Sequence, residues 1–419
     1  MKIHAITLLL IITSTTAIFS QNELTQYVGF LNRQQPPKEY IFELWENADI
    51  IVLGERDHRD TTQYNLILDI LSDDRFIENV GHLYLEVGVI NATDKANELI
   101  KGNYENSSDF CKKFVELQME EIWAPFPWEN YNRYQLLLGL KQINQNLPED
   151  KKITLGLFDM EFSWDNMTVE KYNKFLTDDM NKKYNTREKI MADNFISLYS
   201  SQSPRNGAKK ALIITSREYA GKFNVISKGQ EIKRQAGYIK DVYGEKVKTV
   251  AMNWYKWIHP EDARERYFHP NLTNGLSVDG KWDAAFELTD HRSVGFNLNE
   301  TPFGKVEYDY PFDNQLKWED VFDGYIFYEP YYNFTSKVGF PCQLSLKQAK
   351  EIVKRLKIYD EKYGNKKNVR LLKWFGWFHK YQLKKEYSNM REFPCIKYGY
   401  PNSSNWEQDM TKWFIDSVN

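Results

Sequence analysis

Ile51-Val-Leu-Gly-Glu-Arg-Asp-His58 is the stretch that decides how this chain folds. A run of apolar residues stops at Gly54, and Glu55 and His58 follow it, three residues apart. A short apolar run that stops at a glycine is typical of a buried strand. We therefore expect a first strand over 50–53, and a chemical site where that strand ends by presenting an acid and an imidazole.

A second apolar run, Leu83 to Val89, predicts another strand, and this one carries Glu86. Between the two strands, Asp60 is predicted to cap a helix, with Gln63 in capping-box position three residues later. Two strands joined by such a helix form a βαβ unit, so we expect a sheet that is at least partly parallel. The apolar face of this helix is predicted from residues at helical spacing: Tyr64, Ile67, Ile70 and Leu71.

Polar residues also follow two later strands that the sequence predicts. A strand over 153–158 ends at Asp159, and a strand over 211–215 is followed by Ser216-Arg217-Glu218-Tyr219. Helices are expected over 22–48, 92–147, 168–182, 187–200, 344–362 and 366–387. The remaining apolar runs predict strands, some antiparallel because their connections are short: Val247–Met252, Trp282–Leu288, Ser293–Leu298 and Gly324–Tyr328.

These elements predict an α/β fold with a mixed, partly parallel central sheet that is flanked by helices. The chain has 419 residues, 42% of them apolar and 27% charged, which is the composition of a globular protein. We expect a signal peptide over 1–20 and a single large domain over 21–419. Within that domain, 92–147 would be a helical insertion and 340–390 would contain the C-terminal helices.

The first twenty residues have the pattern of a secretory signal. Lys2 supplies the charge, Ile6 to Ile12 form a short apolar stretch, and mostly small residues precede Gln21. The apolar stretch is too short to span a bilayer, so we expect its removal and an exported protein, periplasmic or extracellular. No membrane span is expected in the rest of the chain.

Three cysteines are too few for a disulfide framework. They are Cys111, Cys342 and Cys395. A single bridge between Cys342 and Cys395 is one option in an oxidising compartment.

Strand-end residues suggest one site. In open α/β sheets, ligands bind beyond the carboxyl ends of the strands. Glu55, His58, Glu86, Asp159 and Arg217 all lie at or near such ends, so we expect them in one crevice as catalytic residues. Neighbouring carboxylates raise one another's pKa, which suits acid and base catalysis, and the arginine would bind an anion. The same oxygen atoms could hold a divalent metal.

Each of these residues also has a structural interpretation. Glu55 could bond loop amides, His58 could cap a helix, and Asp159 could be a turn residue. Glu86 lies within an apolar strand, where an unpaired charge is costly, so Arg187 or Arg217 could simply neutralise it.

Composition and missing motifs exclude several classes of protein. The net charge is −3, with 55 Lys and Arg against 58 Asp and Glu, so no basic excess is available for nucleic acid. The chain has no G-x-S-x-G elbow, H-E-x-x-H motif, Walker loop or G-x-G-x-x-G loop. A small-molecule substrate or ligand is therefore the expected partner.

Four short motifs, in order over about 45–225, resemble those of the erythromycin esterase-like proteins. This superfamily also includes the ChaN-like haem-binding proteins and the Tiki metalloproteases. Residues 54–58 resemble the G-E-x-x-H motif, and Leu85-Glu86 resembles the second-strand glutamate. Residues 156–159 are similar to the third-strand G-x-D, and residues 187–194 are similar to the R-x-x-x-M-A-x-N helix. The resemblance implies an α/β fold in which Glu55 and His58 are the first half of a two-part esterase-like site.

The chain departs from the family after the fourth strand. Esterases of this family carry H-N-x-H there, whereas residues 216–219 read Ser-Arg-Glu-Tyr. Arg217 could stabilise an oxyanion in place of the missing histidines. Tyr219, with an ordinary pKa near 10, would be a poor base at neutral pH.

Two functions follow from these residues. The first is a secreted, divergent hydrolase that activates water at the strand-end residues. The alternative is a non-catalytic protein that binds haem, iron or another small ligand, with His58 and Tyr219 as candidate axial ligands; aromatic residues could also stack on a glycan. Ligand-binding residues are expected to be Arg187, Tyr219, Trp123 and Trp128.

Overall fold

The computed structural model describes residues 24–56, 58, 60–125, 131–179, 186–227, 230–258, 273–308 and 316–394. Its centre is a seven-stranded sheet in the order β10-β11-β7-β1-β4-β2-β3. All neighbours in this sheet are parallel except β10, which is antiparallel to β11. The mixed α/β fold predicted from the sequence is therefore confirmed. The strands are β1 (Ile50–Glu55), β2 (His82–Val89), β3 (Thr154–Asp159), β4 (Ala211–Ser216), β7 (Val247–Met252), β10 (Val294–Asn297) and β11 (Gly324–Phe327).

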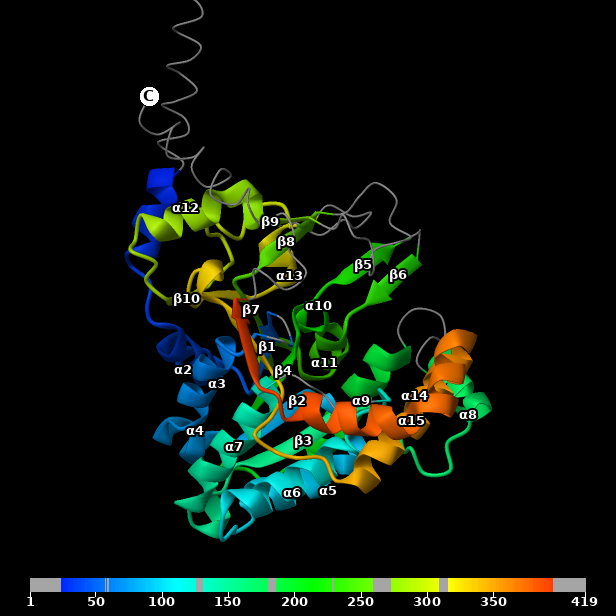
Figure 1. Ribbon diagram of the computed structural model, residues 1–419. Coiled ribbons are helices and arrows are strands. Elements are labelled where there is room, and N and C mark those ends of the chain that lie inside the picture. The colour runs from blue at the N-terminus through cyan, green and yellow to red at the C-terminus, as the bar shows by residue number, and fades with distance from the viewer. Residues whose placement is uncertain are drawn as a thin grey trace, which may run out of the picture.

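Helices cover both faces of this sheet (Figure 1). The first face packs against α2 (Pro37–Asn47), α3 (Gln63–Leu71), α4 (Asp74–Asn79), α5 (Thr93–Lys101), α6 (Ser107–Gln118), α7 (Tyr131–Gln145), α8 (Val169–Lys174) and α14 (Leu346–Lys362). The second face packs against a helix over 24–31 and against α9 (Thr186–Ser201), α10 (Arg217–Ala220), α11 (Gln235–Tyr243), α12 (Lys281–Glu287) and α13 (Trp318–Val321).

The central strands are buried on both faces, which explains why their sequences are continuous apolar runs. Every residue of β1 is buried, as expected for a parallel strand covered by helices on either side. Alternate residues nevertheless belong to different cores: Ile51 and Leu53 lie in the core of the first face, and Ile50 and Val52 in that of the second. This alternation decides where the polar residues at the strand ends point.

Two of the predicted elements are wrong in detail. The run Trp282–Leu288, predicted as a strand, is helix α12, whose Trp282 and Phe286 are buried at a spacing of one helical turn. Asp60 does not cap α3, which begins at Gln63 with Thr62 at its cap position. Asp60 instead accepts a hydrogen bond from Arg56 at 2.8 Å.

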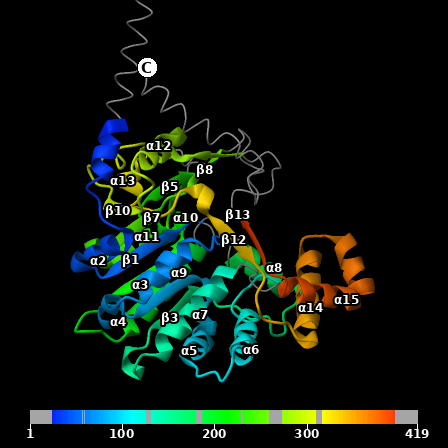
Figure 2. The same cartoon turned by 60° about the vertical axis from the view of Figure 1, so that its left-hand side comes forward.

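Small antiparallel pairs and a helical hairpin complete the fold. The pairs are β5 (Asn224–Ser227) with β6 (Gln230–Lys233), β8 (Tyr255–Ile258) with β9 (Thr273–Leu276), and β12 (Thr335–Val338) with β13 (Arg391–Pro394). Helices α14 and α15 (Lys366–Tyr387), both predicted from the sequence, form a hairpin beside α8 at one side of the molecule (Figure 2). None of the described helices is long and apolar enough to cross a membrane.

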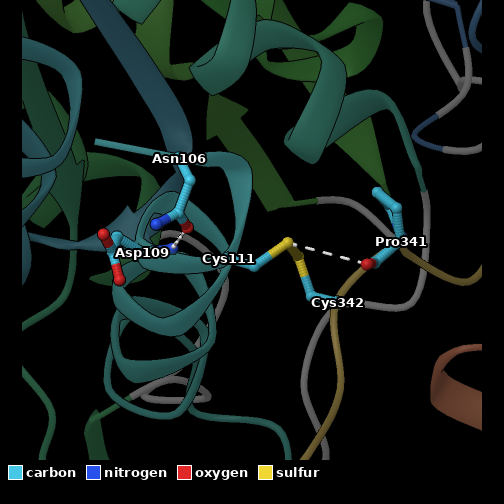
Figure 3. The surroundings of a disulfide bond; sticks show 5 residues. All are labelled: Asn106, Asp109, Cys111, Pro341 and Cys342. Carbon is cyan, nitrogen blue, oxygen red and sulfur yellow. Dashed lines mark hydrogen bonds between the residues drawn. A yellow bond between two sulfur atoms is a disulfide. The ribbon is translucent and has the colours of Figure 1, made fainter. Parts of the chain in front are cut away.

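One disulfide joins the helices of the first face to the segment after β12. Cys111, in α6, pairs with Cys342, and their Cα atoms lie 5.1 Å apart (Figure 3). The suggested Cys342–Cys395 bridge is therefore wrong, and Cys395 lies outside the described residues. Nearby, Phe340 packs edge-on against Phe114, also of α6. The disulfide thus fastens the 335–342 segment, which we call the strap, to the layer of helices on the first face.

Candidate functional site

Polar side chains gather at the edge where the parallel strands end. Glu55, Asp159 and Ser216 are the last residues of β1, β3 and β4, and Glu86 lies near the end of β2. Because β1, β4, β2 and β3 are consecutive parallel neighbours, these ends lie at one edge of the sheet. Glu55 is directly opposite Ser216 in the pairing of β1 with β4.

Glu55, His58 and Tyr64 are in contact and form one group, the Glu55 group. Glu55 is 3% exposed, and its Oε1 contacts Nδ1 of His58. Its Oε2 accepts a hydrogen bond from the Tyr64 hydroxyl at 2.8 Å. The His58 side chain is 32% exposed, so the imidazole lies at the surface of the edge while its carboxylate partner is buried. His58 does not only cap a helix, because its ring nitrogen contacts a buried acid.

Arg56 fixes the loop that carries this group. Its Nε donates to Asp60 at 2.8 Å, and its Nη1 donates to the Tyr328 carbonyl at 2.7 Å and to the Asn253 side chain at 3.2 Å. Its guanidinium also lies 3.5 Å from the centre of the Phe334 ring. The loop after β1 is therefore tied to the ends of β7 and β11 and to the residues before β12.

Arg187 is the centre of a second group, the Arg187 group, with Glu86, Asp159 and Tyr219. Its Nε and Nη2 donate to the two oxygens of Asp159, each at 2.9 Å, which is the strong bidentate arrangement. Its Nη2 also lies 3.5 Å from Glu86 Oε1, and its Nη1 donates to the Tyr219 hydroxyl at 3.0 Å. Of the two partners predicted for Glu86, the structure thus selects Arg187. This one guanidinium accounts for the burial of both acids.

The backbone at the end of β4 holds the other oxygen of Glu86. Glu86 Oε2 accepts from the Ser216 amide at 2.7 Å and from the Thr215 hydroxyl at 2.9 Å. Burial raises the pKa of Tyr219 above its ordinary value, although the nearby Arg187 charge opposes this. Tyr219 therefore remains protonated at neutral pH, and it can donate its proton in a hydrogen bond while it accepts one from Arg187.

The other predicted residues lie at the same edge. The Trp123 indole donates to Asp159 Oδ2 at 3.2 Å, so one aromatic residue of the 92–147 segment reaches the Arg187 group. Arg217 is partly exposed at the start of α10, and its backbone passes close to Gly54 of β1. A Cβ on residue 54 would lie 3.0 Å from the Arg217 Cα, which explains the glycine. Trp128 lies outside the described residues.

Glu55 and Glu86 face opposite sides of the sheet. Glu55 lies on the same side of β1 as Ile51 and Leu53, and it bonds Tyr64 of α3 on the first face. Glu86 lies on the same side of β2 as Tyr84, and it bonds residues on the second face. The single crevice predicted from the sequence is therefore better described as two groups at one edge, joined through Ser216. Ser216 pairs with Glu55 along the strand, and its amide binds Glu86.

Sequence reasoning missed several polar residues next to Glu55. Tyr64 was expected only as part of an apolar helix face, yet it holds the carboxylate. Behind it lies a buried ion pair between Arg133 of α7 and Glu121, with side chains 4% and 0% exposed. The available signal was that Arg133 precedes Leu136, Leu137 and Leu140 at helical spacing, on the face of α7 that is buried. Within the described ranges, no three His, Cys, Asp or Glu side chains come together to hold a metal ion.

Comparisons with known proteins identify structural neighbours only. No family model and no curated protein matches the chain. A succinoglycan biosynthesis protein is similar at 10% identity and a TM-score of 0.49, over 74% of this chain and 96% of that one. An erythromycin esterase in its open conformation is similar at 12% identity and a TM-score of 0.45, over 69% of this chain and 92% of that one. Haem-bound ChaN of Campylobacter jejuni is similar at 13% identity and a TM-score of 0.29, over 51% of this chain and 86% of that one. The structural neighbours therefore include both kinds of protein that the motifs resemble.

Proposed function

We propose that the protein is a hydrolase that acts on an ester or a related bond, with His58 as the base that activates water. The observation that carries this proposal is the contact between the buried Glu55 carboxylate and Nδ1 of the partly exposed His58. A carboxylate at Nδ1 fixes the tautomer of an imidazole and stabilises its protonated form. Nε2 is then the nitrogen that accepts a proton from water.

The reaction balances with these groups. His58 takes a proton from water as the water oxygen bonds to the carbonyl carbon, and the carbonyl oxygen becomes an oxyanion. When the intermediate collapses, the bond to the leaving oxygen breaks and His58 returns the proton to it. Arg217, at the end of the neighbouring strand, is the cation we assign to the oxyanion.

In this proposal the Arg187 group positions its neighbours. Glu86 and Asp159 are engaged by Arg187, so they hold the strand ends in place. Tyr219 keeps its proton and is the neutral donor of this group toward a substrate oxygen. These roles narrow the expectation that both acids are catalytic residues.

We further propose that the protein is exported. The Cys111–Cys342 disulfide supports this, because such bonds persist in oxidising compartments. The apolar segment near the N-terminus agrees with it. Mass measurement of the protein recovered from outside the cytoplasm tests both processing and the disulfide; an unprocessed, reduced chain in the cytoplasm would contradict it.

The hydrolase is tested with the purified protein on a panel of carboxylic esters. General-base catalysis typically contributes about 10²–10⁴-fold, so Glu55→Gln and His58→Ala should each lower kcat by at least about 100-fold. His379→Ala, in the distant helix α15, is the matched control and should leave kcat unchanged. Full activity in the Glu55→Gln/His58→Ala double variant would refute the mechanism.

Binding of a ring-shaped ligand without catalysis is the second candidate. The observation that favours it is that Trp123 and Tyr219 both bond the Asp159–Arg187 pair, which brings two aromatic side chains to one place. Titration of the protein with haemin tests the haem form of this idea. A shifted Soret band that is lost in Trp123→Ala would support it, and an unchanged spectrum at micromolar protein would exclude haem.

A further inference from the structure

A buried polar network lies behind Glu55, on the side away from His58. The Tyr64 hydroxyl binds Glu55, and a small cavity beside both residues is lined by Asn132 and Arg133 as well as by apolar side chains. The cavity offers about 10 Å³ to the centre of a water molecule, which is roughly the space that one water needs. Its walls thus place a guanidinium and an amide around the inner side of the carboxylate.

The ion pair at the end of this network is costly by itself. Arg133 donates to both oxygens of Glu121 through Nε and Nη2, and Gln118 also donates to Glu121. Removing two charges from water costs several kcal/mol, and a buried pair of this kind is often no more stable than apolar residues of the same size. Stability alone therefore does not account for a charge placed next to Tyr64.

The charge of Arg133 reaches the Glu55 group. Burial raises the pKa of Tyr64 well above its ordinary value, the Glu55 anion adds to this, and the Arg133 cation opposes it. Tyr64 is thus a protonated donor to the Glu55 carboxylate, and it lines the same cavity as Arg133. Glu55 contacts the buried Tyr64 hydroxyl through one oxygen and the partly exposed His58 ring through the other.

We propose that Tyr64, Arg133 and Glu121 are positioning residues for the Glu55–His58 pair. They fix the orientation of the Glu55 carboxylate, so that Oε1 stays directed at His58 Nδ1. The roles rest on the proposed hydrolase, in which His58 must be both oriented and basic. They also give the helical segment 92–147 a part in the site, since Glu121 and Arg133 both belong to it.

Two variants test this without leaving a lone buried charge. Tyr64→Phe removes one hydroxyl, and Arg133→Leu with Glu121→Leu removes both charges together. Each should lower kcat about 10-fold with KM unchanged, as is typical when a residue that orients a histidine or its partner is lost. The matched control is Lys222→Met with Asp323→Asn, a part-buried ion pair with an Nζ–Oδ1 distance of 2.8 Å, and it should leave kcat unchanged.

A second measurement does not depend on hydrolysis. Diethyl pyrocarbonate modifies neutral imidazoles, and mass spectrometry follows His58 alone. At about pH 8, where an ordinary histidine is neutral, both test variants should be modified about threefold more slowly than wild type, because an imidazole without a fixed carboxylate is a weaker nucleophile. Thermal unfolding confirms that the variants are folded.

The outcomes separate the two proposals. Unchanged modification of His58 in folded Tyr64→Phe and in the folded double variant would overturn the positioning role, whatever the ester assay shows. Slower modification, together with a wild-type protein that cleaves no ester, would uphold the positioning role and refute the hydrolase.

Discussion

The Glu55 group and the Arg187 group use acids in opposite ways. Arg187 binds two carboxylates and a phenol with a single guanidinium, which neutralises one of the two negative charges in its group. Glu55 is held by a neutral hydroxyl and contacts the imidazole of His58, a residue type whose unperturbed pKa lies near neutral. The three buried acids at this sheet edge thus serve different ends: Glu86 and Asp159 belong to a fixed support built on Arg187, and Glu55 belongs to a group whose imidazole can exchange a proton.

The largest effect on stability should come from removing the cation of the Arg187 group. Arg187→Leu leaves Glu86 and Asp159 buried without their cation, which should lower the free energy of unfolding by about 3–5 kcal/mol. Urea denaturation measures this. Arg217→Leu, the matched arginine at the same edge, has no ion pair among the described residues and should change stability by less than about 0.5 kcal/mol. Equal losses in both variants would erase the distinction between the two groups.

Removing the disulfide should loosen only the Glu55 group. The strap lies on the loop of the Glu55 group, where the Thr61 amide donates to the Thr335 carbonyl at 2.8 Å. Cys111→Ser with Cys342→Ser should cost about 2–4 kcal/mol. Hydrogen exchange should then rise in residues 60–62 and 335–342 and stay unchanged at the start of α9. A uniform rise in both places would show that the two groups open together.

Acid should destabilise β2, the strand that carries Glu86 of the Arg187 group. His82 begins β2, which carries Glu86 near its other end, and burial lowers the pKa of His82 to about 4. Between about pH 6.5 and 4 the unfolded chain binds a proton at His82 that the folded chain does not bind. The free energy of unfolding therefore decreases as the pH is lowered, by about 3 kcal/mol at pH 4. Above about pH 7 this contribution to the pH dependence is absent.

Urea denaturation at several pH values, in wild type and in His82→Gln, measures this effect. The variant should lose the part of the acid sensitivity that arises between about pH 6.5 and 4. The same acid slope in both proteins would mean that His82 is not the cause.

The smallest effect concerns the junction between the groups. Gly54→Ala would place a methyl group 3.0 Å from the Arg217 Cα and 3.1 Å from the Ala220 Cβ, so α10 must shift away from β1. The expected cost is about 1–3 kcal/mol, measured by thermal unfolding. Gly29→Ala is the control, because nothing lies within 4 Å of its Cβ and alanine favours the helix over 24–31. A tolerated Gly54→Ala would imply that the spacing between the groups is loose.

The strands of the parallel core could be predicted from the sequence, since apolar runs ending in polar residues are distinctive. The face of the sheet toward which each acid points could not be predicted from the sequence. Because β1 and β2 are buried on both faces, their sequences do not show which side faces which helices. The sequence therefore does not distinguish the face toward which Glu55 points from that of Glu86. Trp282–Leu288 is too short for periodicity to separate a strand from a helix, and the structure shows a helix.

Partners that are distant in the sequence were also beyond prediction. Arg187 was a candidate for Glu86, but nothing local indicated that it would bond Asp159 and Tyr219 as well. Cys111 and Cys342 are separated by 231 residues, and three cysteines do not reveal which two pair. Tyr64 fitted an apolar helix face so well that its hydroxyl was overlooked.

The strand order has a consequence for biosynthesis. β1 leaves the ribosome early, but the strands that flank it, β4 and β7, begin only at Ala211 and Val247. A nascent chain therefore carries an unpaired apolar strand, with its acid, until residues 211–252 have been added. Such edges favour aggregation and slow folding, so we expect the chain to need chaperones or a delayed collapse until both neighbours have emerged. A truncated product that ends before residue 247 would retain Glu55 and His58 but would leave β1 with an open edge.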